Sequence, residues 1–276
     1  MDSSGVQGDL CATGFFVALP CESPELRPLK NMYFVTAKHV VTDLQNRQAF
    51  LLLNTRSGGT LTVTGITKDW WHFHPTDATA DVAVIPINPG TEVEALGIDI
   101  QLFGLPEVLK NRSIGIGDEV ITVGLFNPAP GTSRSQPIVR HGNISMLPTE
   151  QIQTELGYAD VILVEARSIG GISGSPVFVR NTFMTKVKNR RGEDDVLFAN
   201  GPGVTLLGLM HGHWDIRESD LNKPSIIHDR QHGVNMGIAM VVPAAKIQET
   251  LYAPDLIAIR QESERKLLSQ SVPGMD

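Results

Sequence analysis

The sequence predicts an all-β protein. Short runs rich in Val, Ile, Phe and Thr recur along most of the 276 residues, and these residue types favour strands. Turn-forming stretches such as Ser57-Gly58-Gly59 separate the runs. Helical periodicity of any length begins only after Pro243. The expected strands are 12–19, 32–36, 48–54, 60–66, 81–87, 119–124, 137–146, 159–165, 176–181, 203–212 and 235–242.

The composition is that of a soluble globular protein. The chain is 41% hydrophobic and 19% charged, and its length allows a substantial core. The formal net charge of −7 argues against general affinity for nucleic acids. The sequence contains no apolar run of about 18 residues, so no membrane contact through a spanning segment is expected. The N-terminus lacks the features of a secretory signal, and we expect a cytoplasmic location.

Only two cysteines occur, Cys11 and Cys21. A framework of disulfides is therefore not what holds this fold together. The two thiols either pair across the short strand between them or stay reduced. A reducing compartment favours the reduced form.

The most informative motif is Gly171-Ile172-Ser173-Gly174-Ser175-Pro176, directly ahead of a strand-like run. Its glycines allow a tight turn in which successive N–H groups point at one spot. A plain β-turn is the alternative for this motif taken alone. Ser175 and Ser168 lie nearby, but neither has glycines on both sides. Ser173 is therefore the candidate nucleophile.

Two partners for such a serine lie upstream. His39 follows the apolar run 32–35, and Asp81 opens the strand-like run 81–85. Asp77 is a rival to Asp81, but only Asp81 directly precedes the apolar residues. A serine hydroxyl needs an adjacent base to act as a nucleophile. The chain order His, Asp, Ser is that of the chymotrypsin-type triad.

Together these segments resemble the trypsin-like serine peptidases, in particular their HtrA-like and glutamyl-endopeptidase-like bacterial branch. The matching segments occur in the family's order between about residues 10 and 250. They are Thr13–Val17, Thr36–Val41, Asp81–Ile85, Gly117–Val120 with Val123-Gly124, Gly142–Ser145, Gly171–Pro176 and Met236–Pro243.

The resemblance implies two six-stranded antiparallel β-barrels followed by a C-terminal helix. The first barrel would cover residues 1–104 and carry His39 and Asp81. The second would cover 105–245 and carry Ser173, with the link near 104–115. A helical tail would occupy 246–276, and it would either pack back on the barrels or join two copies of the chain in a homo-oligomer.

The function that the resemblance implies is a serine endopeptidase that cleaves protein or peptide substrates without a cofactor. His39 would act as the base, Asp81 would orient it, and the N–H groups of Gly171 and Ser173 would form the oxyanion hole. Ile172 stands where secreted trypsins carry an aspartate that pairs with a new N-terminus. Activation by that ion pair is therefore not expected.

Two substrate preferences remain open. Arg167 lies where trypsin-like enzymes line the base of the pocket for the P1 side chain, and His211 and His213 come from the facing strand. Three cationic groups would suit an acidic P1 residue. If Arg167 instead points to solvent, the pocket is shallow and lined by Ile169, Met210 and Ile238.

Two other functions are possible. The pairs His72/His74, His211/His213 and His228/His232 have spacings that can chelate zinc, but no adjacent acidic or cysteine cluster completes a ligand set. We therefore expect no metal. The second is a catalytically silent protease fold that binds peptides along the strand 204–211 by β-addition.

Two segments are additional to the motifs. Residues 184–200 are predicted to form a charged hairpin with Arg191-Gly192 near its tip. Pro254-Asp255 is predicted to begin a helix. Its expected apolar stripe consists of Leu256, Ile259, Leu267 and Leu268.

Overall fold

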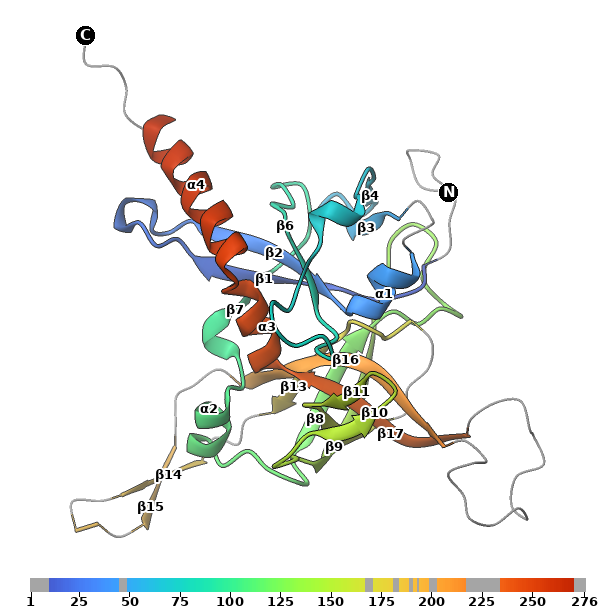
Figure 1. Ribbon diagram of the computed structural model, residues 1–276, viewed down its shortest axis with the longest axis vertical. Helices are drawn as coiled ribbons and strands as arrows, with labels where there is room; N and C mark the ends of the chain where they lie inside the picture. Colours follow the sequence, from blue (N-terminus) through green and yellow to red (C-terminus); the bar gives the residue numbers. More distant parts are fainter. Residues whose placement is uncertain are drawn as a thin grey trace.

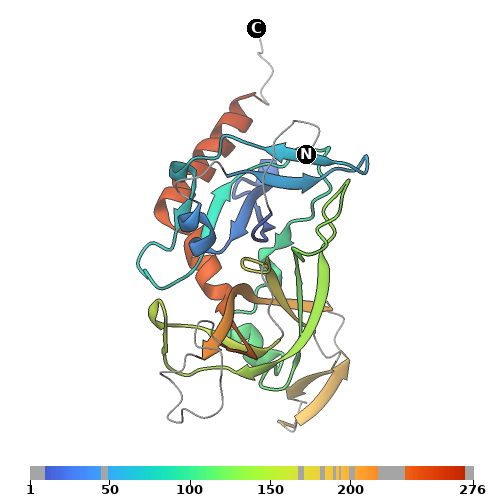
Figure 2. The same ribbon diagram turned by 90° about the vertical axis from the view of Figure 1, so that its right-hand side faces the viewer.

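Two bodies of β-structure lie one above the other in the computed structural model, and a C-terminal helix runs along the upper one (Figures 1 and 2). The structure describes residues 10–44, 49–166, 171–180, 184–188, 191–192, 194–198, 203–216 and 234–270.

The N-terminal body contains a five-stranded sheet with the order β5-β6-β2-β1-β7. Its strands are β1 (Phe15–Pro20), β2 (Lys30–Thr36), β5 (His72–Phe73), β6 (Ala83–Pro86) and β7 (Ile98–Asp99). The strands β3 (Leu51–Asn54) and β4 (Thr60–Val63) form a separate hairpin. Phe16, Phe34, Leu53 and Ile85 pack between the sheet and the hairpin.

The C-terminal body is a closed barrel of six antiparallel strands in the order β12-β17-β16-β13-β8-β9. Fully buried apolar side chains fill it, among them Val177, Leu207 and Val241. The strands are β8 (Glu119–Gly124), β9 (Ile138–Met146), β12 (Ile162–Glu165), β13 (Pro176–Arg180), β16 (Val204–Ile216) and β17 (Val234–Pro243). Two hairpins accompany the barrel. The first is β10 (Ile152–Thr154) with β11 (Gly157–Ala159), and the second is β14 (Met184–Lys188) with β15 (Asp194–Phe198).

The all-β class is confirmed, and the C-terminal barrel is closed as predicted. The N-terminal body differs in detail, because in the described part of the chain β3 and β4 pair with each other and not with the five-stranded sheet. In addition, β7 pairs with β1 in parallel. Strands of two residues, such as β5 and β7, show no alternation in the sequence, which is why the sequence did not predict them.

One apolar cluster joins the two bodies. It combines Val17 and Val35 of the upper sheet with Leu206 and Leu209 of the barrel, and Ile247 of the helix α3 (Ala244–Leu251) packs into the same cluster. Two short helices complete the fold. They are α1 (Lys38–Asp43) and α2 (Pro106–Asn111), and α2 lies in the expected link 104–115.

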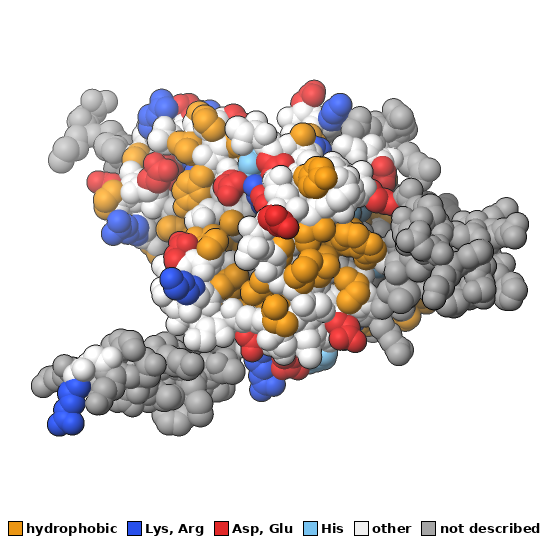
Figure 3. Space-filling model, turned by 60° about the horizontal axis from the view of Figure 1, so that its bottom comes forward, with side chains coloured by type: hydrophobic (Ala, Val, Ile, Leu, Met, Phe, Trp, Pro, Cys, Tyr) orange, Lys and Arg blue, Asp and Glu red, His pale blue; other side chains and the backbone are white. Residues whose placement is uncertain are grey.

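The outer face of the barrel is mixed in character. Figure 3 shows hydrophobic side chains gathered near the middle of the lower face, with acidic and basic side chains around them. Large exposed hydrophobic residues of the barrel half include Ile116, Val139, Leu156 and Tyr158. In the described part of the chain, no helix is long and apolar enough to cross a membrane. Cys11 is exposed and Cys21 is buried, and the two do not form a disulfide.

The last helix, α4 (Pro254–Gln270), packs back along the N-terminal sheet (Figure 1). The expected apolar stripe is wrong in part, because Ile259 and Leu267 are each 40% exposed. The buried side chains are instead Leu256, Arg260 and Glu264, spaced four residues apart along one face of the helix.

Both buried charges on α4 have polar partners. Arg260 Nη1 donates to Tyr33 Oη at 3.0 Å and to the Leu251 carbonyl at 2.6 Å. Glu264 accepts hydrogen bonds from the N–H groups of Glu22 and Ser23 at 3.1 and 3.0 Å, and from Asn31 Nδ2 at 2.9 Å. A charge is tolerated inside a protein only with such compensation. The polar contacts therefore fix where α4 docks.

We predict that Glu264→Gln lowers the free energy of unfolding by about 1–3 kcal/mol, because an amide turns one acceptor oxygen into a donor that faces N–H groups. Burial alone would raise the pKa of Glu264, but the hydrogen bonds from Ser23, Asn31 and Glu22 lower it overall. The contribution of the carboxylate is therefore present at neutral pH, and the difference from wild type should shrink below about pH 4.3.

Urea denaturation at several pH values measures this effect. Glu262→Gln is the matched control, because Glu262 is 48% exposed on the same helix and pairs with the surface cations Arg265 and Lys266. Equal stability of the two variants at neutral pH would contradict the prediction.

Candidate active site

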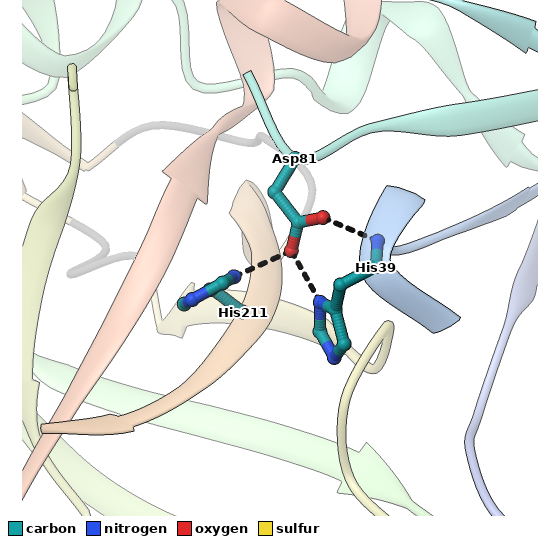
Figure 4. Close-up of side chains that lie close together, drawn as sticks. All are labelled: His39, Asp81 and His211. Atoms are coloured by element: carbon teal, nitrogen blue, oxygen red, sulfur yellow. Dashed lines mark hydrogen bonds and ion pairs between the residues drawn. The ribbon is translucent and has the colours of Figure 1, made fainter. Parts of the chain in front are cut away.

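The fold brings His39 and Asp81 together beyond the same end of two neighbouring strands. β2 and β6 are antiparallel, with Thr36 opposite Ala83. His39 follows β2 as the second residue of α1, and Asp81 lies two residues before β6. Asp81 Oδ1 accepts the backbone N–H of His39 at 2.7 Å, and Asp81 Oδ2 lies 2.7 Å from His39 Nδ1 (Figure 4).

A second imidazole reaches the same carboxylate. His211 Nδ1, from β16, lies 2.5 Å from Asp81 Oδ2 (Figure 4). The centroids of the His39 and His211 rings are 5.1 Å apart, with an angle of 77° between their planes. The register of β16 against β17 shifts between Met210 and Gly212. This bulge lies where the His211 side chain leaves the strand, and the sequence gives no sign of it.

The carboxylate of Asp81 is only 2% exposed. Burial alone would raise the pKa of Asp81, but the hydrogen bonds from His211 and His39 outweigh burial and hold this pKa well below its usual range. Burial also acts on His39, where it lowers the pKa. The hydrogen bond and the charge of Asp81, together with the charge of Asp43, raise the His39 pKa above its ordinary value overall.

The loop around Ser173 depends on its glycines. Gly171 and Gly174 have φ values of 100° and 80°, which favour glycine over other residues. A Cβ atom on Gly174 would lie 2.2 Å from the carbonyl oxygen of Thr13. The two glycines therefore let the loop pass close to the N-terminal body.

Three consecutive carbonyl groups of this loop are hydrogen-bonded. Thr13 Oγ1 donates to the Gly171 carbonyl at 2.7 Å, the N–H of Ser175 to Ile172 at 2.9 Å, and the N–H of Thr13 to Ser173 at 2.9 Å. Within the part of the chain that the structure describes, the N–H groups of Gly171 and Ser173 have no acceptor. The loop thus presents two unpaired donors on either side of Ile172.

The hydroxyl of Ser173 donates to the backbone carbonyl of His211 at 3.1 Å. Among the described residues it makes no hydrogen bond to His39. Bonds between catalytic groups are often long or misaligned without substrate. A hydrogen bond between Ser173 and His39 would require the Ser173 side chain to turn away from the His211 carbonyl.

The other sequence-predicted residues are placed as follows. His213 is exposed on β16, two residues beyond His211. Arg167 lies outside the described residues, as do His228 and His232. The assignment of Arg167, His211 and His213 to substrate binding stays a prediction. The hydrogen-bonding role of Thr13 was not predicted, although Thr13 opens one of the motifs.

The ligand atoms of His39, Asp81 and His211 all lie within 4.8 Å of one another, as metal ligands also do. Ligands at 2.0–2.1 Å in a tetrahedral zinc site would be about 3.3 Å apart. The two Nδ1 atoms lie at 2.7 and 2.5 Å from Asp81 Oδ2, which is the spacing of groups that share a hydrogen. The cluster is therefore built for hydrogen bonds.

The histidine pair before Asp81 contacts the C-terminal helices. His72 Nδ1 lies 2.5 Å from Asp255 of α4, and His74 Nε2 lies 2.6 Å from Glu249 of α3. Lys246 of α3 forms an ion pair with Asp77 at 2.9 Å. Each ring has its own carboxylate, so this pair serves to hold the segment that leads to Asp81.

The comparisons with known proteins concern the fold. No family model and no curated protein match the sequence. Solved structures that resemble it include the protease domain of MamO from Magnetospirillum magneticum, with 15% identity, a TM-score of 0.42 and coverage of 70% of this chain and 85% of that one.

Two further solved structures match this chain with comparably low sequence identity and TM-score. Deg5 shows 13% identity and a TM-score of 0.42, and the match covers 85% of this chain and 84% of that one. A glutamic acid-specific serine protease, described as using a histidine triad in substrate binding, shows 14% identity and a TM-score of 0.39 over 87% and 89% of the two chains. One fold can carry many activities, so the activity must be argued from the site.

We predict that Asp81→Asn brings the pKa of His39 from above to below its ordinary value, because burial remains while the charge that offsets it is lost. NMR titration of the His39 ring protons measures this. Asp43→Asn, which removes the more distant charge, should lower the pKa less. A His39 titration that is unchanged in Asp81→Asn would show that Asp81 does not control this ring.

Proposed function

We propose that the protein is a serine endopeptidase that acts through Ser173, His39 and Asp81. The observation that carries the proposal is the pair of hydrogen bonds between Asp81 and His39, one from the backbone N–H and one from the ring Nδ1. An ionised carboxylate only accepts hydrogen bonds, so the hydrogen stays on Nδ1. The lone pair of the neutral ring is then on Nε2, where a base for a serine hydroxyl must carry it.

In the proposed reaction the Ser173 hydroxyl attacks the carbonyl carbon of the substrate and its proton moves to His39 Nε2. Asp81 stabilises the imidazolium ion that forms. The C–N bond breaks as His39 returns the proton to the leaving amine, and water then releases the acyl group from Ser173 by the same proton transfers. The N–H groups of Gly171 and Ser173 bind the oxyanion at each tetrahedral stage.

Thr13 takes over a task that an N-terminal ion pair performs in secreted trypsins. Its hydroxyl accepts from the N–H of Leu125 at 2.8 Å and donates to the Gly171 carbonyl. Together with the Thr13 N–H on Ser173, these bonds fix the peptide planes of the loop. This supports an oxyanion hole that needs no cleavage of the chain to form, in agreement with Ile172 in place of an aspartate.

The proposed substrates are proteins or peptides. Arg167, His211 and His213 would favour an acidic P1 side chain, and a pocket without Arg167 would favour an apolar one. The ring of His211 already uses Nδ1 for Asp81, so only its other nitrogen remains for a substrate.

A second candidate function is peptide binding without catalysis. The bond from the Ser173 hydroxyl to the His211 carbonyl favours it, because this bond turns the nucleophile away from its base. In that case an extended peptide would add by main-chain hydrogen bonds to β16 beyond Met210, because the pairing of β16 with β13 covers Val204–Leu209 and so occupies most of the stretch 204–211.

Labelling with a fluorophosphonate probe tests the first proposal. Wild type should be labelled, Ser173→Ala should not, and His39→Ala should react at least about a hundredfold more slowly because general-base catalysis is lost. Ser269→Ala, which removes an exposed hydroxyl on α4, is the control and should label normally. If folded wild type does not label, peptide binding becomes the better proposal.

We further predict that Thr13→Val lowers kcat about tenfold to a hundredfold with little change in KM, because the loop carrying the oxyanion donors loses its support. Thr13→Ser retains the hydroxyl and should recover most of the rate. Steady-state kinetics on a peptide substrate, with thermal unfolding as the folding control, compares them. Equal kinetics for Val and Ser variants would exclude the role of the hydroxyl.

A further inference from the structure

The turn that leads to Asp81 is built on the ring of His74. His74 Nδ1 accepts the backbone N–H of Asp77 at 2.9 Å, and the N–H of Thr76 lies 3.4 Å from the same nitrogen. On the other side of the ring, His74 Nε2 lies 2.6 Å from Glu249 Oε2 of α3. Only 3% of the His74 side chain is exposed, so water does not replace a partner that is lost.

These partners determine where the ring carries its hydrogen. A backbone N–H can only donate, so His74 Nδ1 must present its lone pair to Asp77. In the neutral ring the hydrogen is therefore on Nε2, where the Glu249 carboxylate accepts it. A protonated ring carries hydrogens on both nitrogens, and its Nδ1–H would face the N–H of Asp77. The contact at Nδ1 is therefore compatible only with a neutral His74.

Asp77 passes this constraint on toward the candidate site. Its Oδ1 accepts the N–H of Thr79 at 2.9 Å and the Thr79 hydroxyl at 2.6 Å, and its carbonyl accepts the N–H of Ala80 at 3.3 Å. Burial alone would raise the pKa of Asp77, but the hydrogen bonds from Thr79 and Lys246 outweigh burial and hold this pKa well below its usual range. Asp77 therefore stays charged in mild acid, and its hydrogen bonds determine the path of the chain directly before Asp81.

The charged and titratable groups near His74 have polar partners of their own. They are Asp77, Glu249 and Lys246 of α3, Asp160 before β12, Asp255 of α4, His72 of β5, and Lys38 of α1, which donates to the Ala78 carbonyl. Half of the Glu249 side chain is exposed, so water and the ammonium of Lys246 at 3.6 Å weaken its attraction for a proton on His74. The main consequence of protonation is therefore the loss of the acceptor at Nδ1.

We propose that His74 is a positioning residue whose neutral ring holds the turn that leads to Asp81. Protonation of this ring releases the turn and disturbs the alignment of Asp81 on His39. The kinetic consequence rests on the proposed serine endopeptidase activity. Acid then stops the enzyme at two histidines, because His39 must also be neutral to accept the proton of Ser173.

The test compares two amide substitutions of His74, neither of which titrates. In His74→Asn the amide Oδ1 takes the place of imidazole Nδ1 and can accept the N–H of Asp77, as asparagine does in Asx turns. In His74→Gln the amide nitrogen can reach Glu249, but no acceptor lies at the position of Nδ1. The first variant keeps the contact that the proposal requires, and the second keeps only the other one.

Steady-state kinetics on a peptide substrate should separate these variants. At neutral pH, His74→Asn should retain most of kcat, whereas His74→Gln should lose at least about tenfold in kcat with a smaller change in KM, because Asp81 is displaced. In acid, the fraction of plateau kcat/KM that remains should be at least about threefold larger in His74→Asn than in wild type. Thermal unfolding of each variant is the folding control.

NMR titration provides a readout that needs no activity. In the Ser173→Ala background, which prevents self-cleavage, the amide signal of Asp77 should change with the same midpoint as the ring protons of His74. The reason is that the nitrogen that accepts this N–H gains a hydrogen. Adding His74→Asn should abolish the change. His141→Asn is the control, because His141 pairs with Glu119 on the exposed face of the barrel, and it should leave the Asp77 titration unaltered.

The same spectra report whether the turn positions Asp81. The backbone N–H of His39 donates to Asp81 Oδ1, so its amide signal follows the position of this carboxylate. Adding His74→Gln should shift the His39 amide signal, whereas adding His74→Asn should leave it near its place in the parent.

The outcomes separate this proposal from the endopeptidase. If the probe does not label Ser173 but the Asp77 and His39 amides respond as described, the endopeptidase fails and the role of His74 stands. If the Asp77 amide does not follow the His74 ring, the proposal is wrong. It is equally wrong if the Asn and Gln variants have the same kcat, or if acid inactivates His74→Asn as it does wild type.

Discussion

A carboxylate almost removed from water keeps its charge only if donors surround it. Among the described residues Asp81 has three: the backbone N–H of His39, the ring of His39 and the ring of His211. These donors come from the N-terminal body and from the C-terminal barrel. Satisfying one buried charge therefore holds the two bodies in register at the site. Burial of the shared apolar cluster provides most of the free energy that holds the two bodies together. The hydrogen bonds of Asp81 fix how the two bodies are oriented at the site.

The nucleophile loop obeys a related constraint. Its backbone polar groups must be paired wherever the loop is buried, and Thr13 pairs two of its carbonyl groups while Ser175 pairs a third. Among the residues that the structure describes, the N–H groups of Gly171 and Ser173 have no acceptor. The chemistry proposed for Ser173 depends on this division of the loop into a paired and an unpaired side.

The sequence predicted the parts of this arrangement that local chemistry determines. His39, Asp81 and Ser173 stood out because each adjoins an apolar run or a glycine turn, and the structure places Asp81 on His39. The hydrogen bond from His211 to Asp81 was not part of the prediction, which assigned His211 to substrate binding, and it lies at a bulge in β16 that no residue pattern announces. The buried face of α4 was also missed in part, because Arg260 and Glu264 have the residue types of a solvent face and are buried only through partners distant in sequence.

The contacts between the C-terminal helices and the segment before Asp81 bear on how the protein is made. Lys246, Glu249 and Asp255 hold Asp77, His74 and His72, respectively. During synthesis the ribosome releases His39, Asp81 and Ser173 before these helices. The nascent chain therefore carries all three groups while the support of Asp81 is still missing. The contacts that hold residues 72–77 ahead of Asp81 therefore form only after residues 244–255 have been made.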